Sequence, residues 1–100
     1  MEKGLVAIDL YKYLVSLASL LEAVGEAEYA RQVLHVSKFV SGSTTELFGE
    51  ARLLLPGVLQ RSGGKLSELE RVRLRETIAG IESVVTSNAL SGSRPWRHNI

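Results

Sequence analysis

The apolar segment at residues 5–24 restricts the fold more than any other part of this chain. Fifteen of its twenty side chains are apolar. Placed at about 100° per residue, the polar exceptions fall on or beside one strip about 80° wide. They are Asp9, Lys12, Ser16, Ser19 and Glu22. Because a helix that is apolar around the rest of its circumference needs other segments to cover it, residues 5–24 predict the central helix of a helical domain.

The same segment has the length of a membrane-spanning helix, because about 20 apolar residues cross a bilayer. Asp9 and Lys12 lie within it, however, and each costs roughly 2.5–3.5 kcal/mol at the centre of a membrane. A single polar stripe is more typical of a helix that a bundle covers on its other sides. We therefore expect no membrane segment.

Charge and cysteine content exclude several classes of function. Lys and Arg number 12 and Asp and Glu number 11, so no overall field attracts the chain to nucleic acid or to anionic lipid. Without cysteine the chain has no disulfide, no thiolate metal site and no cysteine nucleophile. This composition suits a reducing compartment, and we expect a cytoplasmic protein.

Two further features outline the first half of the domain. Gly25 can adopt the left-handed conformation that ends a helix, and Gly42 is placed to end a second helix at residues 26–41. The inward stripe of this second helix repeats at steps of four and three residues. It consists of Tyr29, Val33, Val36 and Val40, widened by Ala30 and Leu34.

Two capping boxes mark the starts of a third and a fourth helix. In Ser43 with Glu46, and in Ser67 with Glu70, the serine hydroxyl and the glutamate have the spacing that satisfies free amides at a helix start. The fourth helix is predicted to end near residues 87–88. The inward stripes are Leu47, Phe48, Ala51, Leu54, Leu55, Val58 and Leu59 in the third helix, and Leu74, Ile78, Ile81 and Val85 in the fourth.

These segments predict an all-α domain, a four-helix up-and-down bundle, because short links favour antiparallel neighbours. Pro56 removes one backbone hydrogen bond and clashes with the preceding turn. We expect the third helix to be kinked or broken at Pro56, and a break would give an irregular five-helix domain. Residues 1–90 would form the bundle, and residues 91–100 a basic tail that contains Trp96.

The polar stripe of the first helix is one candidate for chemistry. Asp9 as a general base and Tyr13 as an acid, with Ser16 nearby, would make an enzyme site. The alternative is a solvated edge of the bundle, in which Asp9 and Lys12 form a weak ion pair. We favour the solvated edge and predict no catalytic residue and no enzyme.

Metal and phosphate sites lack their sequence signatures. His35 has no second histidine nearby and no Glu-x-x-His motif, so we predict no metal and no cofactor. Residues 62–65, Ser-Gly-Gly-Lys, lack the spaced glycines and the Lys-Ser/Thr ending of a phosphate loop, and they predict a flexible link. Gly80, inside the fourth helix, is interpreted as a place of close packing rather than of ligand approach.

A basic region at residues 61–75 offers an alternative function. Nucleic-acid contact would use Arg61, Lys65, Arg71 and Arg75 together with the tail. Such a face needs its basic residues together with few carboxylates, whereas glutamates interleave here. An ion-paired helix surface is the favoured interpretation.

Apolar residues outside the expected core point to protein binding. Leu53, Leu69 and Val72 lie away from the inward stripes of their helices, and Trp96 stands between arginines in the tail. A large exposed apolar patch usually marks an interaction surface, and Trp and Arg dominate binding hot spots. We therefore expect these four residues to form a protein interface, with a homodimer as the simplest assembly.

The segment Leu-Leu-Glu-Ala-Val-Gly-Glu-Ala-Glu-Tyr-Ala at residues 20–30 is similar to a helix–glycine–helix join in small all-helical immunity-like proteins that neutralise bacterial toxins. This resemblance covers about a tenth of the chain and carries no functional residue with it. The sequence as a whole predicts a small non-enzymatic helical protein-binding module: an adaptor, a regulator or an immunity-like inhibitor that self-associates. A nucleic-acid accessory protein is the alternative.

Overall fold

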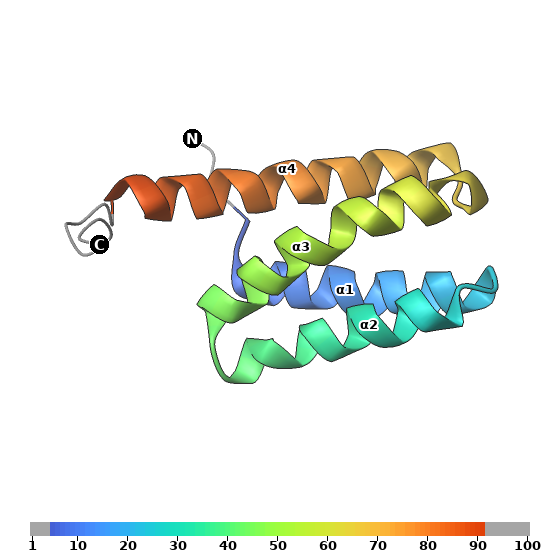
Figure 1. Ribbon diagram of the computed structural model, residues 1–100, viewed down its shortest axis with the longest axis horizontal. Helices are drawn as coiled ribbons and strands as arrows, with labels where there is room; N and C mark the ends of the chain where they lie inside the picture. Colours follow the sequence, from blue (N-terminus) through green and yellow to red (C-terminus); the bar gives the residue numbers. More distant parts are fainter. Residues whose placement is uncertain (1–4, 92–100) are drawn as a thin grey trace.

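The computed structural model describes residues 5–91, including the side chains of residues 5–87. This part of the chain is all-helical, with four α-helices, two short 3₁₀ turns and no strand. The helices are α1 (Ala7–Ala23), α2 (Ala27–Ser37), α3 (Thr44–Ser62) and α4 (Glu68–Ser91), and the turns are η1 (Lys38–Ser41) and η2 (Gly63–Lys65). The prediction of an all-α domain with four helices is confirmed (Figure 1).

Helix α1 supplies a large part of the core with one apolar stripe. Leu10, Leu14, Leu17 and Leu21 recur at helical spacing and are almost completely buried, whereas the polar strip expected along this helix faces solvent. The helix ends as its glycine predicts. Gly25 has φ = 87°, and the Glu26 amide donates to the Leu21 carbonyl over 2.8 Å, which closes the last turn.

Helix α2 continues directly into η1, so together they span most of the predicted second helix. Val33 and Val36 point into the core as expected. Leu34 was expected to widen the inward stripe, but its side chain is 42% exposed. The physical reason is its position about 100° around the helix from Val33, which is the edge of the buried face rather than its centre.

Helix α3 begins at its predicted cap, where the Ser43 hydroxyl accepts a hydrogen bond of 3.1 Å from the Glu46 amide. It is one helix that contains Pro56, so the break that would have made a five-helix domain does not occur. Proline has no amide hydrogen, and the Arg52 carbonyl therefore lacks its usual partner in the ladder. The buried Leu55 and Val58 on either side of Pro56 hold the helical phase through it.

Helix α4 begins at a complete capping box. The Glu70 amide donates to the Ser67 hydroxyl over 3.2 Å, and the Ser67 amide donates to the Glu70 carboxylate over 2.8 Å. The helix extends to Ser91, beyond the end predicted from its apolar pattern. After Gly80, which lies inside the helix, the sequence has no glycine or proline before Gly92, so neither residue type stops the helix at residues 87–88.

Packing joins the helices mainly in two pairs, α1 with α2 and α3 with α4 (Figure 1). Leu74 and Ile81 of α4 and Leu47 of α3 belong to one buried core that also contains side chains of α1 and α2. Gly80 is a site of close packing, although its neighbour is the segment before α1 rather than a helix. A Cβ at Gly80 would meet the Leu5 side chain at 3.4 Å.

Candidate protein-interaction surface

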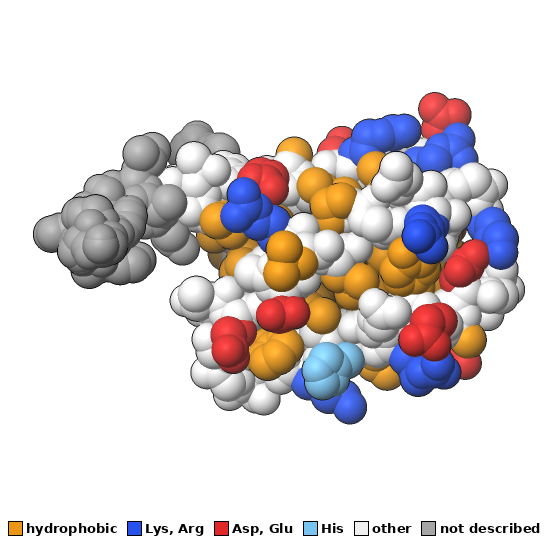
Figure 2. All heavy atoms as spheres, in the orientation of Figure 1, with side chains coloured by type: hydrophobic (Ala, Val, Ile, Leu, Met, Phe, Trp, Pro, Cys, Tyr) orange, Lys and Arg blue, Asp and Glu red, His pale blue; other side chains and the backbone are white. Residues whose placement is uncertain are grey.

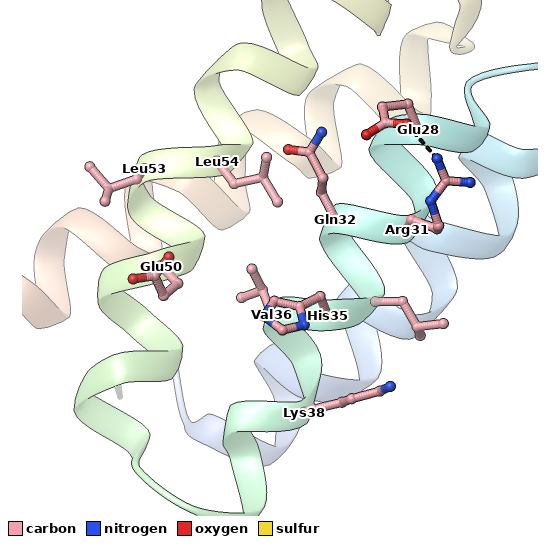
Figure 3. Close-up of a pocket in the computed structure, with 10 residues that line it drawn as sticks. Glu28, Arg31, Gln32, His35, Val36, Lys38, Glu50, Leu53 and Leu54 are labelled. Atoms are coloured by element: carbon pink, nitrogen blue, oxygen red, sulfur yellow. Dashed lines mark hydrogen bonds and ion pairs between the residues drawn. The ribbon is translucent and has the colours of Figure 1, made fainter.

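A groove runs between α2 and α3, with a volume of about 690 Å³. Val36 and Leu54 form its apolar part, because each points from its helix toward the other helix (Figure 3). On this face of the molecule, hydrophobic side chains are surrounded by side chains of both charges (Figure 2). An apolar floor with a charged rim is the usual composition of a site that binds protein.

Leu53 stands on the α3 wall of the groove. It directly precedes Leu54 in the chain, and the rotation of the helix from one residue to the next turns Leu53 away from α2 (Figure 3). Its side chain is 77% exposed, so the prediction that Leu53 lies outside the core is confirmed. Any role in an interface remains a prediction.

The other residues predicted for the interface are not all at this groove. Leu69, in the first turn of α4, is 68% exposed as expected, but it does not line the groove. Val72, also expected off the core, is half-buried and is not among the side chains packed against the buried core. Trp96 lies outside the described residues.

Leu34 is the residue that the sequence interpretation missed. It lines the groove between α2 and α3, and it also lines a furrow of about 370 Å³ between α1 and α2 with Val15. Leu34 therefore lies on the outer surface of α2, between the groove and the furrow. Its angular distance from Val33 and Val36 was the signal that could have identified it.

Charged residues on the rim of the groove differ in whether they are paired. Arg31 forms an ion pair with Glu28 on the same helix. No ion pair of Lys38 or Glu50 is found within residues 5–87, and both are exposed. His35 is exposed, as expected, and its ring lies edge-on to Phe39 with centroids 5.9 Å apart. Lys38 and Glu50 are thus available to a partner.

Asp9 and Tyr13, the pair considered as an enzyme site, do not both line the groove between α1 and α4. Tyr13 lines a groove of about 400 Å³ between α1 and α4, with Glu70 and Arg73 on the other side. Asp9 does not line this groove and faces solvent. Burial raises the pKa of Tyr13 to about 12, with Arg73 opposing the shift and Glu70 adding to it. A tyrosine that holds its proton so firmly is a poor general acid near neutral pH.

Two of the four residues of the basic region contribute to the fold. The Arg71 guanidinium donates to the carbonyls of Gly63, over 3.2 Å, and Leu66, over 2.7 Å. It therefore ties α4 to the η2 turn, a role that the sequence did not reveal. Lys65 forms an ion pair of 2.7 Å with Glu26. Arg61 and Arg75 are exposed.

The Ser-Gly-Gly-Lys segment links α3 to α4, as expected, and does so through the η2 turn. Ser62 is the last residue of α3, and Gly63 is buried at the start of η2. The Lys65 ammonium lowers the pKa of Glu26, chiefly by hydrogen bonding. The buried Ser62 hydroxyl lies near enough to add a smaller lowering, although it makes no well-formed hydrogen bond.

Within the described residues, no three histidine, aspartate or glutamate side chains come together as metal ligands. Among the helices of the same part, none combines the length and the apolar character needed to cross a membrane.

Comparison with protein-family models, with curated proteins and with solved structures finds no significant match to this chain. The interpretation of its function therefore depends on its own surface.

Proposed function

We propose that this chain is a small non-enzymatic helical protein-binding module that self-associates, with the role of an adaptor, a regulator or an immunity-like inhibitor. The observation that carries the proposal is the groove between α2 and α3, where Leu34 and Leu53 remain exposed beside an apolar floor. The similarity of residues 20–30 to immunity-like proteins is the reason for naming an inhibitor among the roles.

The clustering of apolar side chains at the groove, more than the exposure of each one, supports the proposal. Single apolar side chains are normal on protein surfaces. Leu34 and Leu53, however, flank a groove whose floor is already apolar, so one partner could cover all of it at once. Burying a leucine side chain completely is worth about 1.5–3 kcal/mol, and two of them would give such a partner a useful share of its affinity.

The proposal includes a finer description of the fold and its setting. We expect the four helices to alternate in direction as an up-and-down bundle, because their connections are short. We expect α3 to bend at Pro56, where a backbone hydrogen bond is missing. Residues 1–90 would act as one domain in the cytoplasm, with residues 91–100 as an appended tail, and Trp96, Leu69 and Val72 would provide secondary contacts.

The nucleic-acid alternative receives less support. Arg71 and Lys65, two of its four proposed contacts, already bind carbonyls and a carboxylate within the chain. If the chain nevertheless binds nucleic acid, and this binding weakens steeply as the salt concentration rises, the alternative replaces the proposal.

The proposal is tested by measuring mass in solution over a wide range of protein concentration. The wild type is expected to associate, and replacing Leu53 by Ala should weaken association by about 1 kcal/mol or more while circular dichroism remains unchanged. Lys12→Ala, on the solvated stripe of α1, is the control and should have no effect. A wild type that stays monomeric and binds no protein would overturn the proposal.

A further inference from the structure

We infer that the groove between α2 and α3 is occupied by a second copy of this chain, in a dimer whose twofold axis runs along the groove. The inference rests on the proposed function and goes further by naming the surface, the occupant and the direction of the axis. It follows from the difference between the two walls of the groove and from the charges on them.

The exposed leucines on the two walls of the groove, Leu34 and Leu53, can contact each other under this symmetry. Leu34 stands on the α2 wall and Leu53 on the α3 wall, turned away from α2 (Figure 3). In a twofold interface, a contact from one position to another always occurs twice. An axis along the groove lays α3 of one copy over α2 of the other, so each Leu53 faces a Leu34 and the apolar floor is enclosed.

The unpaired charges select the direction of the axis. Glu50 on α3 and Lys38 at the end of α2 lie toward the same end of the groove, away from the paired Glu28 and Arg31 (Figure 3). With the axis along the groove, Glu50 of each copy meets Lys38 of the other. An axis across the groove at the level of Glu50 would instead lay α3 over α3 and place one Glu50 opposite the other, which like-charge repulsion opposes.

A charge-exchange experiment tests this arrangement directly. Glu50→Lys leaves two positive residues at the contact, and Lys38→Glu leaves two negative ones, so each variant alone should dimerise about tenfold or more weakly than the wild type. Mixing the two variants restores both ion pairs in a heterodimer. We expect the mixture to form dimers at concentrations where neither variant does, and this recovery should fade at high salt.

The matched control is Glu76→Lys, the same charge change at an exposed position of α4 away from the groove. Ile8→Asp provides a second comparison with Leu53→Asp, because both side chains are exposed but only Leu53 lines the groove. Dimers lost with Leu53→Asp and kept with Ile8→Asp and Glu76→Lys would support the inference.

The outcomes separate the inference from the proposed function. A wild-type dimer that tolerates Glu50→Lys, Lys38→Glu and Leu53→Asp would overturn the groove as its interface while leaving self-association in place. A dimer lost with Leu69→Asp alone would move the interface to α4. A wild type that is monomeric at every concentration would overturn both.

Discussion

Individual glycines show how backbone conformation and space decide the effect of one methyl group. Gly25 has φ = 87°, a region that a residue with a Cβ occupies only with strain. Gly49 lies inside α3, and a Cβ there would meet no atom within 4 Å. We therefore expect replacement of glycine by alanine to have opposite effects on stability at the two positions.

Gly25→Ala is expected to lower the free energy of unfolding by about 1–2 kcal/mol, because the helix end must then strain or rearrange. Gly49→Ala is expected to raise it by about 0.5–1 kcal/mol, because alanine loses less conformational freedom on entering a helix. Urea denaturation followed by circular dichroism measures both. Equal effects of the two variants would show that φ at Gly25 does not control the join between α1 and α2.

Arg71 illustrates how one side chain holds a connection between two elements. Its guanidinium reaches back from α4 to two carbonyls of the η2 region. Arg71→Ala is expected to destabilise the fold by about 1–3 kcal/mol, because it removes hydrogen bonds made by a charged donor. Arg75→Ala, one helical turn farther along α4 and exposed, is the control and should stay within about 0.5 kcal/mol of the wild type. Chemical denaturation measures the stability of both variants, and equal stabilities would contradict a structural role for Arg71.

The pair of Glu26 and Lys65 connects the turn between α1 and α2 with the turn between α3 and α4. The lowered pKa of Glu26 means that the folded state favours the carboxylate. Its contribution to stability is therefore present above the unfolded pKa of about 4.3 and is lost as pH falls through the lower folded pKa.

Glu26→Gln should consequently be less stable than the wild type near neutral pH, and the difference should vanish in acid. Denaturation curves recorded at a series of pH values measure this difference. Glu76→Gln, which changes an exposed glutamate of α4, is the control and should show no such dependence. If the difference in the free energy of unfolding between wild type and Glu26→Gln persists or grows as the pH falls, a stabilising ion pair at Glu26 is contradicted.

At the scale of the whole molecule, sequence reasoning succeeded where the signal was local. The serines of the two caps and the helix stop at Gly25 act on neighbouring amides and carbonyls, so their spacing was enough to place the helices. The exposure of Leu53 and Leu69 followed from helical periodicity in the same way.

The failures involve contacts between distant segments. The carbonyls that Arg71 binds become accessible only when η2 folds tightly. The uninterrupted course of α3 through Pro56 depends on its buried neighbours. The groove between α2 and α3 could not be predicted either, because Leu34 and Leu53 are far apart in sequence and come together only through the fold.

The central claim is that this chain leaves an apolar groove that a second copy covers. Light scattering on an equimolar mixture of the Glu50→Lys and Lys38→Glu variants tests it most directly. The account predicts a mixture with twice the mass of the chain at a concentration where each variant alone is monomeric. A mixture that remains monomeric while the wild type dimerises, or a wild type that never exceeds the mass of one chain, would contradict it.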